Sequence, residues 1–341
     1  MPELRIDPLS GLRTIVAGER SDRPGAFPGA GPRPPVDPER DPFLEGHEAQ
    51  TPPEVAALRP DGAARDEPGW RVRVVPNLYP ALSGDGVRET EDAGGGSDPL
   101  AEGRGEPDLF ASRPASGAHE VIVNSPRPVS SLADLSAEEL ETAMGVWRER
   151  MSAHRSAACV HLIVNEGEQA GASLPHTHAQ LYALEFVPAL IARERERFTA
   201  YSNRTHGRNL LEDLVQEEVR RRERLVAVDA EAVALCPFAA RVPFQLQLVP
   251  RRPAARFEDP GPLAAGLLHD VLGRLARALG GDVPPLNLWV RSAPRGAEHF
   301  CWRIDVLPRL AQPAGLEVGA GIDLCPLAPE RAAELLRDAG D

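Results

Sequence analysis

Short stretches in which apolar and polar residues alternate recur along the chain, and each predicts a β-strand with one buried face. They lie at 70–75, 119–124, 159–165, 176–184, 244–249, 286–291 and 300–307. Two segments instead repeat apolar residues every three or four positions, which predicts amphipathic helices. One begins at a capping box formed by Ser136 and Glu139, and the other spans 262–279.

The order strand, helix, strand, strand occurs twice, at 119–184 and again at 244–307, which predicts an internal duplication. Similar sequences accompany it, since VIVNSPRPVSSLADL in the first copy resembles LQLVPRRPAARFEDP in the second. We expect an α+β fold in which antiparallel sheets pack against helices. The expected domains are residues 1–190 and residues 191–341.

Three further segments complete this outline. Residues 5–17 predict a short pair of strands, and the strongly charged segment 189–224 between the copies predicts a pair of solvated helices. Residues 83–117 are rich in glycine, aspartate and glutamate and contain few apolar side chains, which predicts a long exposed loop.

The composition is that of an ordinary globular protein, but its basic residues are unusual. Of 341 residues 42% are hydrophobic, and the formal net charge is −13. An acidic chain does not have the basic face that general nucleic-acid binding needs. All 38 basic residues are arginines, which excludes a lysine Schiff base and a lysine-dependent phosphate loop. An anion must therefore be bound by arginine, histidine, backbone N–H groups or a metal.

Nothing in the sequence predicts export or membrane insertion. The cysteines Cys159, Cys236, Cys301 and Cys325 are far apart, so they predict neither a disulfide framework nor a zinc knuckle. The first residues contain no apolar leader, and no apolar run approaches the ~20 residues that span a membrane. We expect a cytoplasmic protein with no membrane or nucleic-acid partner.

The segment from Gly171 to Gln180 has the clearest potential for chemistry. In an extended strand, His176, His178 and Gln180 lie on one face, because successive side chains alternate. Two imidazoles and an amide then converge beside a loop in which backbone N–H groups and the Ser173 hydroxyl can bind an anion. On spacing alone, two histidines with purely structural hydrogen bonds are the alternative.

The sequence HTHAQ at 176–180 resembles the His-x-His-x-Gln signature of the galactose-1-phosphate uridylyltransferase branch of the histidine-triad superfamily. Further segments resemble the same family in colinear order along nearly the whole chain. They are RIDPLSG at 5–11, VVPNLYPAL at 74–82, CPFAARVPF at 236–244 and GLEVGAG at 315–321. The resemblance implies two histidine-triad-like repeats in tandem, of which the first carries the nucleophile.

The resemblance implies that His178 is a nucleophile that attacks the α-phosphorus of a nucleotide sugar and forms a covalent nucleotidyl-histidine. It places His176 beside the nucleophile and makes Gln180 a hydrogen-bond donor to a phosphate oxygen. Glutamine cannot transfer a proton, which favours group transfer over hydrolysis. Substrate-binding roles are implied for Arg20, Arg23, Asn77, Asn165, Gly171, Ser173 and Glu317. The two arginines would neutralise phosphate charge, and the glutamate would face the hexose.

Many members of this family bind zinc through a Cys-x-x-Cys pair and two histidines. Here His119 and His176 match the histidines, but Asp41 and Leu44 stand where the cysteines would be. Leucine cannot bind zinc, so the available site would consist of Asp41, His119 and His176 and would be weaker than a thiolate site. Zinc is therefore an uncertain cofactor, no organic cofactor is expected, and without zinc the histidines would fix the loop by hydrogen bonds.

The second copy has different residues at the positions of the signature. Its register places Cys301, Arg303 and Asp305 opposite the two histidines and the glutamine. We therefore expect one nucleophile per chain. A second metal site of some relatives would need Glu194 and a histidine pair, and Cys301 and Arg303 replace that pair. We expect that site to be absent, with an arginine supplying the charge.

The resemblance implies a UDP-glucose:hexose-1-phosphate uridylyltransferase, with galactose 1-phosphate as the acceptor, that works by a ping-pong mechanism. An ADP-sugar or dinucleoside-polyphosphate phosphorylase carries the same signature and is one alternative. A nucleotide-sugar binder without catalysis is the other. Relatives are often dimers with residues that reach across the interface, so a homodimer is implied as well.

Overall fold

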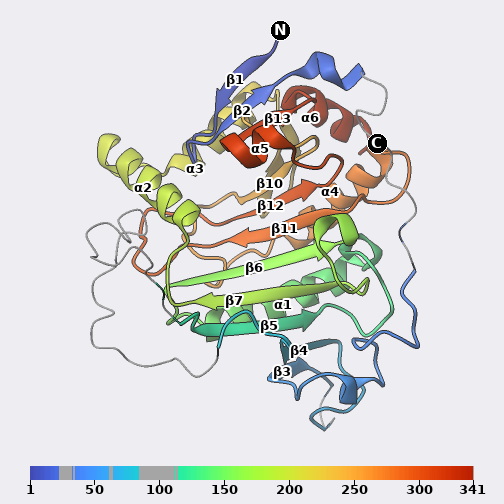
Figure 1. Cartoon of the computed structure of the whole chain (residues 1–341). Coiled ribbons are helices and arrows are strands. Elements are labelled where there is room, and N and C mark those ends of the chain that lie inside the picture. Colours follow the sequence, from blue (N-terminus) through green and yellow to red (C-terminus); the bar gives the residue numbers. More distant parts are fainter. Residues whose placement is uncertain (23–32, 34, 61–63, 84–111, 113, 341) are drawn as a thin grey trace.

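A ten-stranded antiparallel sheet runs through both halves of the protein (Figure 1). The computed structural model describes all residues except 23–32, 34, 61–63, 84–111, 113 and 341. The order of the strands is β3-β4-β5-β7-β6-β11-β12-β10-β9-β8. The predicted exposed loop at 83–117 falls largely outside the described residues.

Each half of the chain contributes five strands to this sheet, ordered here from its edge to its centre. The first half provides β3 (Ala56–Leu58), β4 (Val72–Pro76), β5 (Gly117–Val123), β7 (His178–Leu184) and β6 (Cys159–Glu166). The second half provides β8 (Leu225–Val228), β9 (Ala232–Leu235), β10 (Leu246–Pro250), β12 (Arg303–Pro308) and β11 (Leu286–Arg291).

The registers of the central strands relate the two halves by a pseudo-twofold axis between β6 and β11. Ile163 of β6 pairs with Trp289 of β11 at this axis. On one side Gln180 of β7 pairs with Ile163, and on the other Asp305 of β12 pairs with Trp289. The predicted α+β fold with tandem histidine-triad-like repeats is thus confirmed. The division at residue 190 stays a prediction, because strands of both halves share one sheet.

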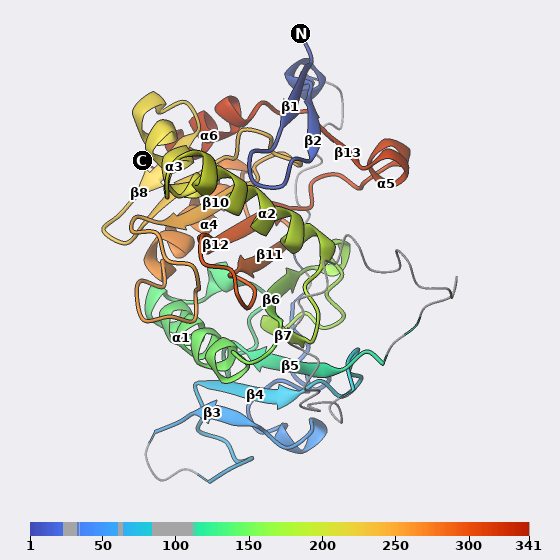
Figure 2. The same ribbon diagram turned by 90° about the vertical axis from the view of Figure 1, so that its left-hand side faces the viewer.

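Three helices cover one face of the sheet, α1 (Ala137–Ala153), α4 (Ala265–Ala278) and α6 (Pro329–Asp338). Figure 2 shows α1 and α4 on the same side of the strands. The predicted capping box begins α1, since Ser136 Oγ accepts the N–H of Glu139 at 3.2 Å and the Glu139 carboxylate accepts the N–H of Ser136 at 2.7 Å. The fully buried side chains of Trp147 and Leu268 then join both helices to one core.

Among the described residues, helices cover the other face of the sheet not in the first half but in the second. There α2 (Ala189–Arg204) and α3 (Leu210–Arg221) bury Phe198 and Leu211 against Val233 and Leu235 of β9. The two predicted helices are present, but the prediction that they are solvated is wrong for the side of each helix that packs against β9. The charge of this segment hid its apolar stripe, because glutamates and arginines occupy most of the intervening positions.

A small three-stranded sheet joins the two ends of the chain. Its strands are β1 (Glu3–Ile6), β2 (Arg13–Val16) and β13 (Ile322–Cys325), and the short helix α5 (Gly315–Ala320) precedes β13. The hairpin of β1 and β2 agrees with the predicted strand pair at 5–17, while the parallel pairing of β2 with β13 was not foreseen. The N-terminal strands thus pack against the second half of the chain.

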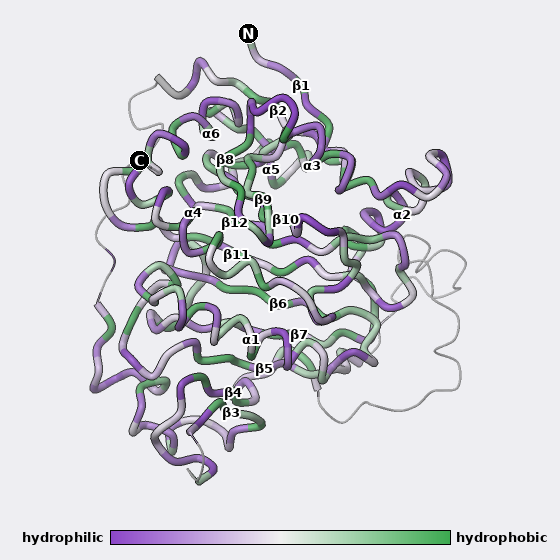
Figure 3. The backbone as a smooth tube through the Cα atoms, turned by 180° about the vertical axis from the view of Figure 1, so that it is seen from behind, coloured by the Kyte–Doolittle hydropathy of each residue, from purple (hydrophilic) through white to green (hydrophobic). Residues whose placement is uncertain are grey.

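Hydropathy follows these layers. Figure 3 shows hydrophobic segments in the central strands and a largely hydrophilic outer helix α2. Among the described residues, no helix is both long enough and apolar enough to cross a membrane.

The buried carboxylate of Glu166, at the end of β6, joins three segments beside the His-x-His motif. It accepts the hydroxyl of Ser131 at 2.7 Å, the N–H of Leu132 at 2.6 Å and the hydroxyl of Thr177 at 3.2 Å. Burial disfavours the charged form and raises the pKa of Glu166 to about 6. The folded state therefore binds this proton at a higher pH than the unfolded chain does.

We predict that Glu166→Gln removes a pH dependence of stability. The folded pKa of about 6 lies above the unfolded value of 4.5, so the favourable contribution is complete below the unfolded value and is lost as the pH rises through the folded one. The variant should gain about 2 kcal/mol of unfolding free energy relative to the wild type between about pH 4.5 and about pH 7.5. Urea unfolding across this range measures the difference.

Glu139→Gln is the matched control, because Arg127 lowers the pKa of Glu139. The unfolding free energy of this variant relative to the wild type should therefore not rise with pH. Parallel stability curves for Glu166→Gln and the wild type would contradict the prediction.

Candidate active site

The first residue of β7 is His178, and its side chain lies on the face of the sheet opposite to α1 and α4. Ala179 and Leu181 point into the core beneath those helices, so His178 and Gln180 point to the other side. The strand was predicted to begin at His176, but it begins two residues later. His176 lies in the preceding loop, so the prediction that it shares a strand face with His178 and Gln180 assumed a strand geometry that His176 does not have.

The ring of His178 is held in one orientation by the backbone of its own motif. Nδ1 lies 2.8 Å from the carbonyl oxygen of His176, which can only accept, so Nδ1 carries the proton and Nε2 keeps its lone pair. The side chain is 5% exposed. Burial lowers the pKa of His178, with the carbonyl bond acting in the opposite direction. A neutral ring with an unprotonated Nε2 has the form that a nucleophile needs.

The neighbouring ring of His176 is fully buried, and both of its nitrogens are bonded. Nδ1 lies 2.6 Å from the Asp41 carboxylate, and Nε2 lies 2.8 Å from the carbonyl oxygen of Ser125. Phe43, two residues after Asp41, packs against both histidines, with ring centroids 6.2 Å from His176 and 5.1 Å from His178. Sequence reasoning missed Phe43, because only the fold brings the segment at 41–44 to the motif.

Gln180 is oriented by two rings. Its carbonyl oxygen Oε1 lies 3.0 Å from His119 Nε2 and accepts the hydroxyl of Tyr182, also at 3.0 Å. His119 Nδ1 accepts the N–H of Ala81 at 3.2 Å, so Nε2 is the ring nitrogen that faces Gln180. With the oxygen occupied in this way, the NH₂ group of Gln180 is the end that can donate to a phosphate oxygen. Tyr182, which stacks on His119 at 4.1 Å, was not predicted.

Asn77 and Asn165 reach this face from two different strands. The amide nitrogen of Asn77, just after β4, lies 3.1 Å from His119 Nε2. Asn165, near the end of β6, follows the residue that pairs with Ala179 and so lies next to His178. Its Oδ1 accepts from Asn287 of β11 at 2.8 Å. Asn287 was not predicted, although it is contributed by the strand that duplicates β6.

The predicted anion loop lies between β6 and β7. Gly171 ends the short 3-10 helix Glu168–Ala170 with a φ of +85°, which favours glycine. Ala170 in this helix accepts a hydrogen bond from Asn287 through its carbonyl oxygen. Ser173 is exposed in the segment that follows. This arrangement brings the loop to the same end of β6 and β7 as His178.

Two further predicted residues, Arg20 and Glu317, make no contact with the residues around His178 among those that the structure describes. Arg20 is exposed in the 3-10 helix Gly18–Asp22 that follows β2, and Arg23 lies outside the described residues. Glu317 is exposed in α5, where its carboxylate accepts the N–H of Ala314 at 2.8 Å and so caps the helix. The contacts of Arg20 and Glu317 within the chain give no evidence of a role in binding substrate.

The three expected zinc ligands do not fit a zinc site in their present arrangement. Asp41 and His176 bond directly to each other, and His119 bonds to Gln180 and Ala81 instead. Among the described residues, no group of three histidine, cysteine, aspartate or glutamate side chains is placed to hold a metal.

In the second half the corresponding positions hold a buried network of charges. Arg303 lies 3.0 Å from Glu194 and 3.0 Å from Asp305, and Arg291 lies 3.4 Å from Glu194. Asp305 also accepts a hydrogen bond from Trp289 Nε1 at 2.9 Å. The two arginines and two carboxylates balance each other, so Arg303 is neutralised within the protein rather than offering a free positive charge.

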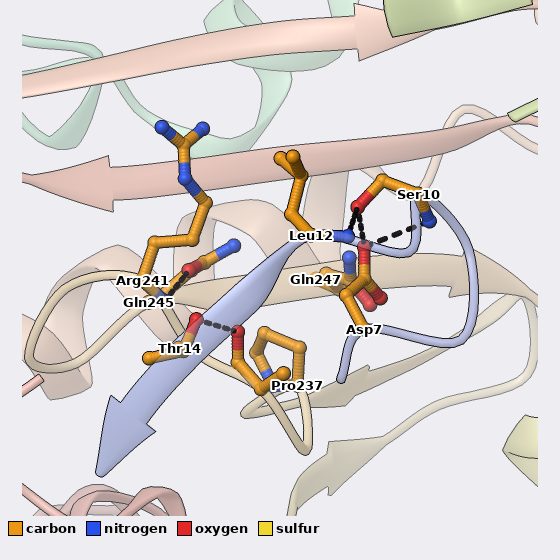
Figure 4. A pocket seen from close by; sticks show the side chains of 9 residues that line it. Asp7, Ser10, Leu12, Thr14, Pro237, Arg241, Gln245 and Gln247 are labelled. Atoms are coloured by element: carbon orange, nitrogen blue, oxygen red, sulfur yellow. Dashed lines mark hydrogen bonds between the residues drawn. The ribbon is translucent and has the colours of Figure 1, made fainter. Parts of the chain in front are cut away.

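A small polar cavity lies away from His178, between the N-terminal hairpin and β10 (Figure 4). Its volume of about 30 Å³ is enough for a water molecule but not for a nucleotide. Its lining includes Asp7, Ser10, Arg241 and Gln247, none of which was predicted to bind substrate.

Comparison with known proteins agrees with this geometry. Residues 1–188 match the family model of the galactose-1-phosphate uridyl transferase N-terminal domain, and residues 131–338 match a domain of unknown function, DUF4921. An ADP-glucose phosphorylase from Arabidopsis thaliana is 28% identical, with 99% of this chain and 93% of that protein covered. A galactose-1-phosphate uridylyltransferase from Streptomyces lividans is 27% identical, with 87% and 82% covered.

A solved structure supports the same relationship. The crystal structure of an ADP-glucose phosphorylase from Arabidopsis thaliana with bound ADP-glucose superimposes with a TM-score of 0.76 at 25% identity, and 99% of each chain is covered. The family match spans more than half of the chain and includes the His-x-His-x-Gln motif. The chain is a nucleotidyltransferase and belongs to the galactose-1-phosphate uridyl transferase family.

Proposed function

We propose that the protein transfers a nucleotidyl group from a nucleotide sugar to a phosphate-bearing acceptor through a covalent intermediate on His178. The observation that supports this most is the 2.8 Å contact of His178 Nδ1 with the His176 carbonyl oxygen, which leaves the lone pair of Nε2 available. Nε2 attacks the α-phosphorus, the new P–N bond forms, and the P–O bond to the β-phosphate breaks. The hexose 1-phosphate leaves with the electron pair of that bond.

The second displacement reverses these events with another acceptor. An oxygen of the incoming phosphate attacks the α-phosphorus, the P–N bond breaks, and His178 returns to the neutral form. While the intermediate exists, its ring carries positive charge, and the N–H at Nδ1 donates to the His176 carbonyl oxygen throughout. Neither displacement requires a proton transfer, which is consistent with Gln180 at a position where it can donate but cannot act as an acid.

ADP-glucose as donor and inorganic phosphate as acceptor is the combination that the comparisons favour. The Arabidopsis thaliana ADP-glucose phosphorylase aligns with this chain over nearly the full length of both proteins. The structure with bound ADP-glucose covers 99% of both chains as well.

UDP-glucose with galactose 1-phosphate is the second candidate, and a different observation favours it. The family match spans residues 1–188, and uridylyltransferases from several organisms are among the relatives, including the one from Streptomyces lividans. Both candidates share the same chemistry at His178. A cytoplasmic location fits either of them, because the four free cysteines are buried thiols of a kind common in reducing compartments.

We predict a covalent adduct when the protein is mixed with donor and no acceptor. Intact-protein mass spectrometry should show one adenylyl group per chain with ADP-glucose, or one uridylyl group with UDP-glucose. His178→Ala should form no adduct with either donor, and His154→Ala, which lies on the other face of the sheet and bonds to Glu120, should react like the wild type. A folded wild type that forms no adduct but binds a donor would favour a non-catalytic binder.

We also propose that the protein forms a homodimer in which α5 of one copy contacts the active-site face of the other. This helix buries none of its residues, and Val318 on it is 79% exposed. An unburied apolar side chain on a short helix beside Glu317 suits an interface.

For this dimer, Val318→Asp should weaken association roughly tenfold or more, because it would bury an unpaired charge. Light scattering after size-exclusion chromatography measures the mass over a range of concentrations. Val228→Asp, at an exposed valine of the edge strand β8, is the control and should leave the mass unchanged. A monomeric wild type, or a Val318→Asp variant that associates normally, would contradict the proposal.

A further inference from the structure

The segment that contains Asp41 lies against the candidate nucleophile, and the Asp41 carboxylate uses both of its oxygens there. Oδ2 lies 2.6 Å from His176 Nδ1, and Oδ1 accepts the N–H of Phe43 at 3.0 Å. The backbone oxygen of Asp41 lies 2.7 Å from His47 Nδ1 and thereby closes the same turn. Asp41 is 3% exposed, and its two carboxylate bonds are buried, while the bond to His47 is partly exposed.

The partners of Asp41 leave no donor atom for a metal. Both nitrogens of His176 are bonded, one to Asp41 and one to the Ser125 carbonyl oxygen. Each ring nitrogen therefore faces an oxygen of this chain at hydrogen-bond distance, and neither is free to ligate a metal. Leu44, three residues after Asp41, has no ligating atom. The residues form a hydrogen-bonded pair, which differs from the metal site expected from the sequence.

The pair positions His178 by two routes. His176 supplies the carbonyl oxygen that bonds to His178 Nδ1, so fixing the His176 ring against Asp41 also restricts this peptide. The turn that Asp41 organises places the Phe43 ring 5.1 Å from the His178 ring. One route sets the tautomer and direction of the nucleophile, and the other limits the space into which its ring can rotate.

We infer that Asp41 is a positioning residue for His178, and that its hydrogen bonds to His176 and Phe43 perform in this chain the ordering role expected of a metal. The inference rests on the proposed function for its kinetic consequences and on geometry alone for its structural ones. A nucleophile misplaced by about 1 Å can lose about a hundredfold in rate. Asp41 itself touches no reacting atom, so its effect reaches the reaction through His176 and Phe43.

The test compares Asp41→Ala with Asp41→Asn. Asparagine can still accept the Phe43 N–H through its oxygen and donate to His176 Nδ1 through its nitrogen. Alanine loses both bonds. We expect adduct formation to slow about ten- to hundredfold in Asp41→Ala at saturating donor, with the donor concentration for half-maximal rate little changed, and to recover to within about fivefold in Asp41→Asn.

Glu120→Ala is the matched control for a general loss of stability. Glu120 is a buried carboxylate that also bonds to a histidine, His154, at 2.8 Å, but it faces α1 on the other side of the sheet. This variant should unfold at a lower temperature and keep the wild-type rate of adduct formation. Equal slowing in Glu120→Ala and Asp41→Ala at matched melting temperatures would overturn the inference, as would an unchanged rate in Asp41→Ala.

Two further measurements do not depend on activity. Elemental analysis of the purified wild type should find zinc well below one atom per chain, and a full complement that is lost in Asp41→Ala would overturn the inference. Nitrogen NMR of labelled histidine should show His178 as the Nδ1–H tautomer in the wild type and as a mixture in Asp41→Ala. If the wild type forms no adduct at all, the proposed function fails, and these spectra still decide the role of Asp41.

Discussion

The antiparallel pairing of β6 with β11 is the contact on which the other features depend. It joins the innermost strand of one repeat to the equivalent strand of the other, so both repeats share one sheet and one apolar core. It also brings Asn287 of the second repeat to Asn165 of the first. The candidate active-site face is therefore assembled from both copies, although only the first retains the histidine motif.

Duplication gave this face of the sheet two equivalent halves, and the two halves differ in what covers them. In the second half, α2 and the N-terminal hairpin cover the face, and Glu194, Arg291, Arg303 and Asp305 fill it with paired charges. Removing one member of such a buried ion pair leaves the other charge unpaired, which lowers the stability of the fold. In the first half, the central positions of β6 and β7 remain half-exposed beside His178. The second half therefore has a structural role, and the first half carries the candidate active site.

Local patterns made much of this architecture predictable. Alternation identified most strands of the large sheet, and the Ser136 capping box identified the start of α1, because both signals depend on neighbouring residues. The missed features depend on residues far apart in the chain. The pairing of β2 with β13, the contact of Phe43 with His178, and the bond from Asn287 to Asn165 each require the completed fold. The start of β7 was misplaced because alternation continues past the point where hydrogen bonding to neighbouring strands stops.

The two histidines of the motif show how position within one strand end determines chemistry. The two rings are two residues apart in the sequence and both are buried. His176 nevertheless has hydrogen-bond partners at both nitrogens, and His178 has one at Nδ1. A ring with two accepting partners can stabilise a loop but cannot attack phosphorus, whereas a neutral ring with one accepting partner can. The motif therefore does not provide two equivalent imidazoles. It provides one reactive imidazole and a second whose ring and backbone keep the first in place.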